Sequence, residues 1–309
     1  MTLQQLVYAV KIADTKSMNK AAAELYVSQP ALSSTIRDLE EELNIELFIR
    51  TNRGIVITAE GDEFLSYARQ MVELNQMIED GTITEDNCKM GYVGAFPYAE
   101  VISGYTSFYL GAKSVCPSVT MEVKYTNSWA SFDLEKECAD ALISDGCVLI
   151  SQHADTTGAP TACEAAGVPC VGYNIDMTSV APNTALTSAS MDWGVYYTYA
   201  VQCMLDGTAI DTDWCKGFSD GADKITPLNE KVVAEGTDEK VKEVEDALAD
   251  GSLHVFDTST FTVDGKELTT YKKDGSDTEY VSDGYFHESE YGSAPAFDVA
   301  IDGITSITE

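Results

Sequence analysis

The residue pattern of this chain changes near residue 80, and that change limits what the chain can fold into. All of the arginines lie in residues 1–80, which hold no cysteine, and all eight cysteines lie in residues 81–309. Residues 1–80 carry apolar residues at helical spacing, whereas residues 89–205 alternate between strand and helix patterns. Together with a length of 309 residues, this change predicts at least two domains.

The formal net charge of −32 is distributed unevenly along the chain. Residues 1–80 carry 7 basic and 13 acidic groups, and residues 81–309 carry 12 and 38. A surface as acidic as the second part repels phosphate, so DNA contacts must come from a local basic patch in the first part. The N-terminus lacks the pattern of an export signal, and no long apolar run occurs. We therefore expect a cytoplasmic protein without a membrane span.

Cysteine and histidine spacing gives no sign of a metal site. The cysteines form no CxxC pair, and we expect no cofactor, no metal and buried free thiols rather than disulfides. A phosphate loop, a nucleophile elbow and paired carboxylates near a histidine are all missing, so the sequence predicts no catalytic residues and no enzyme. His153, His254 and His287 lie in unrelated sequence contexts.

Three helical segments precede residue 44. Ser17 and Ser28 stand where N-caps of the second and third helices are expected, and Pro30 falls in the first turn of the third helix. One face of this third helix is apolar, and the opposite face carries short polar groups and a cation, as a helix that enters a major groove requires. The residues predicted to contact DNA from this face are Gln29, Pro30, Ser33, Ser34 and Arg37.

A hairpin is predicted in "ELFIRTNRGIVIT", where apolar residues alternate around an Asn-Arg-Gly turn. Arg50 and Arg53 flank this turn and could hold phosphates beside the groove. From periodicity alone, a plain three-helix domain with an incidental hairpin explains residues 1–58 as well.

The identity of the residues in this region, beyond their periodicity, points to a protein family. "SMNKAAAELYVSQPALSSTIRDLEEELNIELFIRTNRGIVITAEG" closely resembles the DNA-binding domain of the LysR-type transcriptional regulators, and the resemblance spans residues 2–80. It implies an all-α winged helix-turn-helix domain in residues 1–58 that binds double-stranded DNA through the residues named above, Arg50 and Arg53 included.

A longer helix follows in residues 59–80, with apolar residues spaced three and four positions apart. The helix could pack on its own domain, but the resemblance implies a linker helix that forms a homodimer. The predicted dimer residues are Phe64, Tyr67, Met71, Leu74 and Ile78.

Residues 89–205 predict a parallel sheet with helices on both faces. Ligands of such sheets bind beyond the C-terminal ends of the strands. Aromatic, amide and acidic side chains occur there and could sandwich a flat heterocycle. The predicted ligand residues are Trp129, Gln152, His153, Asp155, Tyr173, Asn174, Asp176 and Trp193. Packing of both tryptophans in the core, a structural role for His153 and a capping role for Asp176 are the alternatives.

A second resemblance covers residues 89–309. "GYVGAFPYAEVISGYTSFYLGAKSVCP", "SQHADTTGAP" and "VGYNIDM" resemble the BMP family of solute-binding lipoproteins of ABC transporters. The family implies a type I periplasmic-binding-protein-like α/β fold of two lobes that binds purine nucleosides or bases. Asn174 and Met191 stand where the nucleoside-binding branch carries Asp and Lys, which favours a free purine base.

The BMP-like part begins partway through that family's pattern, so we expect the first lobe to be largely missing. Residues 81–88 are then a linker, residues 89–205 the ligand-binding lobe, and residues 206–309 a segment that returns toward the absent lobe.

Three functions fit these patterns. The first is a LysR-type regulator with a purine-sensing domain, and the second is the substrate-binding protein of an importer for purines or nucleosides. The third is an accidental join of two genes without a single evolved function, which a DNA read across codons 77–96 would test.

Overall fold

The computed structural model describes residues 2–51, 54–62, 64–65, 68–69, 72, 88–234 and 236–307. These residues belong to two compact units, residues 1–84 and 85–309.

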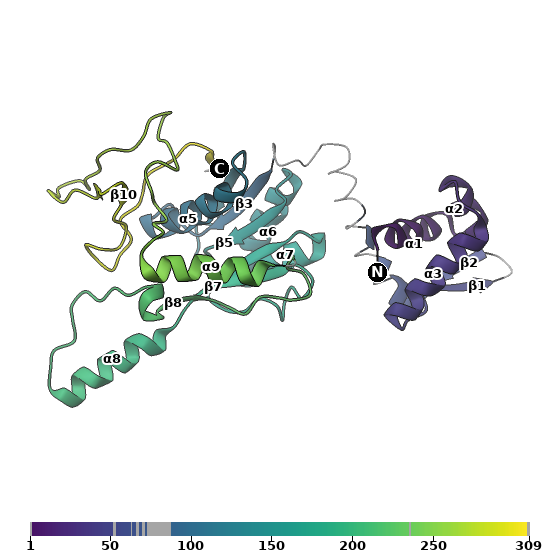
Figure 1. Cartoon of the computed structure of the whole chain (residues 1–309), viewed down its shortest axis with the longest axis horizontal. Coiled ribbons are helices and arrows are strands. Elements are labelled where there is room, and N and C mark those ends of the chain that lie inside the picture. The colour runs from purple at the N-terminus through teal and green to yellow at the C-terminus, as the bar shows by residue number, and fades with distance from the viewer. Residues whose placement is uncertain are drawn as a thin grey trace. The chain divides into compact units, whose positions relative to one another are not determined.

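Up to Ile57, the described residues of the first unit form three helices followed by a two-stranded hairpin (Figure 1). Its elements are α1 (Leu3–Thr15), α2 (Met18–Glu24), α3 (Gln29–Leu43), β1 (Phe48–Thr51) and β2 (Gly54–Ile57). The two strands pair antiparallel from Phe48 opposite Ile57 to Thr51 opposite Gly54, which confirms the predicted hairpin.

Both predicted N-caps are confirmed. The Ser17 side chain accepts a hydrogen bond from the backbone N–H of Lys20 at the start of α2. The Ser28 side chain accepts one from Ala31 at the start of α3, where a proline occupies the first turn. Each cap satisfies a backbone donor that has no partner within its helix, which fixes where the helix begins.

Apolar side chains of all three helices form the core of the first unit. The buried face of α3 packs against small and branched residues of α1 and α2, because alanines on α2 let the helix backbones approach closely. The central members are Ala9, Ile12, Ala21, Ala22, Leu32, Ile36 and Leu39.

The second unit is built around one sheet with helices between its strands. Its strands are β3 (Lys89–Gly94), β4 (Thr120–Tyr125), β5 (Leu149–Gln152), β6 (Cys170–Tyr173), β7 (Ala185–Met191), β8 (Asp223–Ile225) and β11 (Ile304–Ile307). A separate small hairpin is formed by β9 (Val281–Ser282) and β10 (Tyr285–Phe286). The helices are α5 (Ala99–Val115), α6 (Phe132–Ser144), α7 (Gly158–Ala166), α8 (Trp193–Asp206), the 3-10 turn η1 (Phe218–Asp220) and α9 (Thr237–Asp250).

The strand order of the seven-stranded sheet is β11-β4-β3-β5-β6-β7-β8. All neighbouring pairs are parallel except β7 and β8, which are antiparallel. The parallel majority confirms the predicted α/β fold. The antiparallel edge strand β8 was not predicted, and neither was the pairing of β11 with β4.

Side chains of β3 alternate between two separate cores, one on each face of the sheet. Met90 and Tyr92 lie in a cluster with α5 and with aromatic residues of the segment 256–301. Val93 lies in the other cluster, which is supplied by α6, α7 and the strands β5 to β7. Because successive strand residues point to opposite faces, helices cover both faces, as the sequence predicted.

Helix α8 buries little of its apolar surface against the rest of the second unit. It extends away from the sheet in Figure 1, and Trp193, Tyr197 and Met204 are 58%, 61% and 74% exposed. The expectation of buried thiols holds for only four of the eight cysteines, because Cys215 is exposed and Cys88, Cys116 and Cys138 are half-buried. None of the eight is in a disulfide. Within the described ranges, no helix is long and apolar enough to cross a membrane.

Candidate functional site

The predicted DNA-reading residues of α3 lie outside its buried face, and Pro30, Ser34 and Arg37 lie opposite the buried Leu32, Ile36 and Leu39. Pro30 and Arg37 are exposed, and Gln29, Ser33 and Ser34 are partly exposed. Arg37 donates from Nη2 to Ser34 Oγ at 3.4 Å. The positions repeat at helical spacing, so α3 presents polar donors and acceptors together with one cation along one stripe.

A carboxylate joins α3 to the hairpin. Glu40 Oε1 accepts hydrogen bonds from the backbone N–H of Leu47 at 2.8 Å and of Phe48 at 3.1 Å. The backbone N–H of Ile55 in β2 donates to Lys16 O at 3.2 Å. The hairpin is therefore held against both α3 and the turn after α1. Sequence reasoning missed Glu40, although the "LEEEL" run at the end of α3 contains it.

The hairpin arginines and the dimer residues are described only in part. Arg50 lies in β1 opposite Ile55, and Arg53 lies outside the described residues. Phe64 packs on the core of the first unit. The other predicted dimer residues, Tyr67, Met71, Leu74 and Ile78, lie outside the described residues.

In the second unit, aromatic rings gather where β3, β4, β5 and β6 end. Phe96 and Tyr98 stack with centroids 5.2 Å apart, and Phe96 lies 5.6 Å from Trp129. Trp129 lies 6.5 Å from His153, which lies 4.4 Å from Tyr173. This continuous ring set contains three predicted ligand residues and adds Phe96 and Tyr98. The sequence signal for both was "GAFPY", directly after the first strand.

His153 is the buried member of the ring set. Its Nδ1 lies 3.5 Å from Tyr92 Oη. Its Nε2 is buried without a hydrogen-bond partner among the described residues and lies 3.8 Å from Glu100 Oε1. Burial lowers the pKa of His153 to about 4, so the imidazole is neutral at pH 7. Gly104 on α5 leaves room for the ring, because a Cβ there would lie 2.6 Å from Nδ1.

Two further predicted residues lie beside the ring set and bond to each other. Asn174 Nδ2 donates to Asp155 Oδ1 at 3.0 Å. The backbone N–H of Asp155 donates to Trp129 O at 2.8 Å, and Ser190 Oγ donates to Asn174 O at 2.8 Å. These bonds connect the loops after β4, β5 and β6, so the predicted edge residues belong to one hydrogen-bonded network.

Two buried side chains, Glu135 and Gln152, hold the loops of this network through hydrogen bonds. Glu135 accepts hydrogen bonds from the backbone N–H of Ser131 and from both the N–H and Oγ1 of Thr156. Gln152 Nε2 donates to Ala154 O at 2.6 Å and Thr156 O at 2.9 Å, while its buried Oε1 has no partner among the described residues. Gln152 thus lies under the loop that carries His153 and Asp155.

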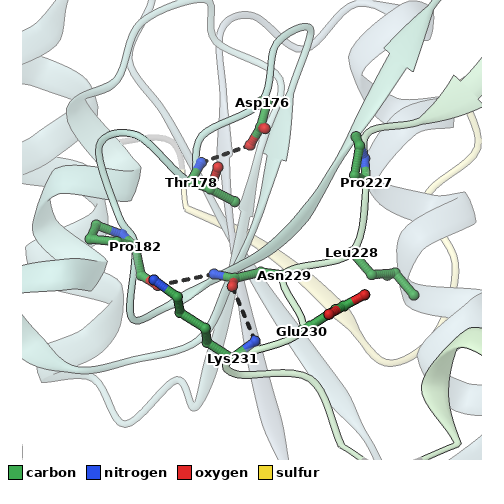
Figure 2. A pocket seen from close by; sticks show the side chains of 8 residues that line it. All are labelled: Asp176, Thr178, Pro182, Pro227, Leu228, Asn229, Glu230 and Lys231. Carbon is green, nitrogen blue, oxygen red and sulfur yellow. Dashed lines mark hydrogen bonds between the residues drawn. The ribbon is translucent and has the colours of Figure 1, made fainter.

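Asp176 and Trp193 are placed apart from the ring set. Asp176 Oδ1 accepts a hydrogen bond from the backbone N–H of Thr178 at 2.8 Å within a turn, and no helix begins there for Asp176 to cap. It lines an open cavity of about 420 Å³ with Thr178, Pro182, Pro227, Leu228, Asn229, Glu230 and Lys231 (Figure 2). Trp193 begins α8, and no ring contact joins it to the set in the described part of the chain. The structure therefore does not bring these two residues to the aromatic edge.

Among the residues that the structure describes, there is no group of three or more His, Cys, Asp or Glu side chains that could hold a metal ion. The aromatic edge offers flat apolar surfaces, a neutral imidazole, an amide and two carboxylates. Such a surface can stack on and hydrogen-bond a small flat molecule.

The fold and these sites define a two-part protein, in which a helix-turn-helix unit of the regulatory type is followed by an α/β unit of the substrate-binding type. Residues 83–252 match the model of the ABC transporter substrate-binding protein PnrA-like family, and the chain belongs to that family through more than half of its length. Residues 3–62 match the bacterial regulatory helix-turn-helix protein, lysR family. Both resemblances predicted from the sequence are confirmed.

Individual relatives match one unit or the other. A purine-binding protein of Brucella abortus is 35% identical over 182 residues, which are 57% of this chain and 50% of that protein. A probable RuBisCO transcriptional regulator of Guillardia theta is 48% identical over 73 residues, 24% of each chain. A solved ABC transporter solute-binding protein from Conexibacter woesei is 23% identical with a TM-score of 0.43, covering 54% of this chain and 56% of that one.

The chain spans about half the length of the substrate-binding relatives that it matches. The two matching families are a family of regulators and a family of binding proteins.

Proposed function

We propose that the chain is a DNA-binding transcriptional regulator whose second unit senses a small flat heterocycle of the purine class. The observation that carries this proposal is the presence of both family matches in one chain. A lysR-family helix-turn-helix serves to place α3 in a major groove. The polar stripe of α3, held to its hairpin through Glu40, supports that role. A protein that reads DNA works in the compartment that holds the DNA, the cytoplasm.

The aromatic edge supports a purine-type ligand. Purines are flat and carry several hydrogen-bond acceptors and donors, which the faces of Trp129 and Tyr173 and the unpartnered Nε2 of His153 would match. The purine-binding relative from Brucella abortus points to the same class. Because Asn174 already bonds Asp155, we propose that these two act as one polar group toward the ligand.

DNA binding is tested by fluorescence anisotropy of the full chain with the DNA upstream of its own gene at low salt. We expect saturable DNA binding whose midpoint shifts when adenine is added. Glucose, which is not aromatic, is the control and should leave the midpoint unchanged. Arg37→Ala should weaken DNA binding. It should also reduce the slope of log affinity against log salt concentration by about 1, the contribution of one phosphate contact. Lys242→Ala, a cation lost from exposed α9, should leave binding unchanged. A chain that binds no DNA at low salt would refute the proposal.

We also propose that the regulator is a homodimer through the segment of residues 59–80, for which the sequence predicts a linker helix. Two copies would present two α3 helices about one DNA turn apart. Light scattering of the full chain gives its mass directly, and a monomer at the concentrations used for DNA binding would contradict the dimer.

An accidental join of two genes is the second candidate. The observation that favours it is that the two family matches end and begin at residues 62 and 83 without overlap, and each covers only part of its relatives. A DNA read across codons 77–96 from the source would separate the candidates. The importer alternative gives the helix-turn-helix no role and is not pursued.

A further inference from the structure

A serine, a histidine and a glutamate that do not belong to the ring set lie together at the small hairpin of β9 and β10. The Oγ of Ser282 is 2.7 Å from His287 Nε2. On the other side of the imidazole, Nδ1 is 2.6 Å from Glu290 Oε2. An oxygen nucleophile within hydrogen-bond reach of a base, which is itself held by an acidic group, is the arrangement that activates serine for attack.

The partners of His287 decide where its proton lies. An ionised carboxylate only accepts hydrogen bonds, so Glu290 requires His287 to carry its proton on Nδ1. The Nε2 lone pair then faces Ser282 and can accept the hydroxyl proton. Ser282 Oγ also lies 3.3 Å from Asp283 Oδ2, but the contact to Nε2 at 2.7 Å is shorter and better suited to proton transfer.

The hairpin holds this arrangement in place. Phe286, between the serine and the histidine in the hairpin, is 2% exposed and packs 4.9 Å from Phe297. The backbone N–H of His287 donates to Tyr280 O at 2.8 Å. Tyr285 Oη donates to the second carboxylate oxygen of Glu290 at 3.0 Å. The imidazole and the carboxylate are therefore positioned before any substrate arrives, as an efficient site requires.

The serine is accessible to a reagent, whereas its base is shielded. Ser282 is exposed and His287 is 5% exposed. A two-residue turn follows the serine, with φ angles of 54° at Asp283 and 88° at Gly284. Because Ser282 lies on an exposed turn, the site offers a substrate few contacts and little binding energy. We therefore expect a small substrate that is already activated.

We propose that Ser282, His287 and Glu290 form a nucleophilic triad that attacks small activated carboxylic esters. The same attack on a fluorophosphonate forms a bond between Ser282 Oγ and phosphorus and breaks the bond to fluorine, which leaves as fluoride, while the hydroxyl proton moves to His287 Nε2. Ser282 Oγ bonds to the ester carbonyl carbon while its proton moves to His287 Nε2. The bond to the leaving oxygen then breaks, and that oxygen takes the proton from Nε2. Water next attacks the acyl carbon and gives a proton to Nε2. The bond between that carbon and Ser282 Oγ then breaks, Oγ takes the proton from Nε2, and the acid is released. Ester and water thus become acid and alcohol without any redox step.

The test uses the full chain and two probes, a fluorophosphonate label and p-nitrophenyl acetate. We expect one label per chain, mapped by peptide mass to Ser282, and none on Ser282→Ala. His287→Asn keeps a donor near Glu290 but lacks Nε2, so labelling and ester hydrolysis should slow by on the order of 100-fold, the usual contribution of a general base. Ser259→Ala is the matched control, because Ser259 is exposed and its Oγ donates to the carboxylate of Asp257 at 2.7 Å.

The variants also separate reactivity from folding. Ser282→Ala leaves the contact between His287 and Glu290 intact, and its circular dichroism and thermal midpoint should match those of the unaltered chain. Label on another residue, or equal labelling rates before and after His287→Asn in folded protein, would overturn the triad.

Discussion

Glu135 Oε2 accepts a hydrogen bond from Thr156 Oγ1 at 2.7 Å, across 21 residues of sequence. The same carboxylate accepts from the backbone N–H of Ser131. Glu135 therefore joins the loop after β4, which carries Trp129, to the loop after β5, which carries His153. The aromatic edge thus depends on a buried side chain that is not itself a member of the ring set.

Replacing Glu135 should loosen both loops. Glu135→Gln turns one acceptor oxygen into a donor, so a half-buried backbone N–H of Ser131 or Thr156 loses its partner. The cost is about 1–3 kcal/mol in the free energy of unfolding. Urea unfolding of the full chain measures this cost. Glu137→Gln, an exposed acid on the same helix, is the control. Equal stability of the two variants would show that the Glu135 contacts do not stabilise the unit.

Gly104 should be intolerant of a side chain, because a Cβ there would lie 2.6 Å from Nδ1 of His153. Gly104→Ala should cost about 1–3 kcal/mol of stability through overpacking. It should also displace the imidazole and weaken adenine binding by about tenfold, or 1.4 kcal/mol, as measured by calorimetry.

Gly111 is the matched control on the same helix, since a Cβ there meets nothing within 4 Å. Gly111→Ala should stabilise α5 by up to about 1 kcal/mol through helix propensity and leave adenine binding unchanged. If Gly104→Ala behaved in the same way, the close packing of His153 on α5 would be disproved.

Acid should destabilise the second unit through His153. Burial lowers the pKa of His153 from its ordinary 6.5 to about 4 in the folded chain. Between these values the unfolded chain binds the proton and the folded chain does not. Stability therefore falls as the pH drops from 6.5 toward 4, by at most about 3 kcal/mol.

Urea midpoints of the unaltered chain and of His153→Gln, measured between pH 7.5 and 5, isolate this contribution from that of the carboxylates. The variant should show a shallower loss of stability on acidification. His254→Gln, an exposed histidine that stacks on Tyr285, is the comparison. A loss of stability equally steep in His153→Gln would contradict the assignment to His153.

Glu40 should affect DNA binding although its carboxylate faces the backbone. Glu40→Gln weakens the hydrogen bonds to Leu47 and Phe48 and frees the hairpin from α3, so DNA affinity should fall by a few-fold. Glu41→Gln removes the same charge from an exposed position and should raise affinity slightly by reducing repulsion. Anisotropy titrations compare the two variants, and a matching rise for Glu40→Gln would exclude the bracing role.

Features set by neighbouring residues were predictable from the sequence. The caps at Ser17 and Ser28 and the hairpin after α3 depend on residues only a few positions apart, and the alternation of strands and helices carries its own period. Three members of the aromatic edge, Trp129, His153 and Tyr173, were predictable from their positions after strands, because parallel strands end on one side of their sheet.

Features that depend on distant residues were not predictable. Trp129 and Trp193 both follow strands, but Trp193 is exposed on α8 because that helix packs little against the sheet. Glu135 has the sequence of an ordinary surface acid on a helix, and only the folded loops show its burial. His287 gained its partners from the fold of the hairpin, which brings Ser282 and Glu290 to opposite sides of one imidazole.

The pairing of β11 with β4 has a consequence for synthesis of the chain. Ile304 lies opposite Met121, about 180 residues earlier. At a translation rate of ~5–20 residues per second, β4 is made roughly 10 to 40 s before its outer neighbour. During that interval its backbone edge is open to strands of other nascent chains. Slower translation, or crowding of ribosomes on one message, should therefore increase misassembly before any loss of stability in the finished protein is seen.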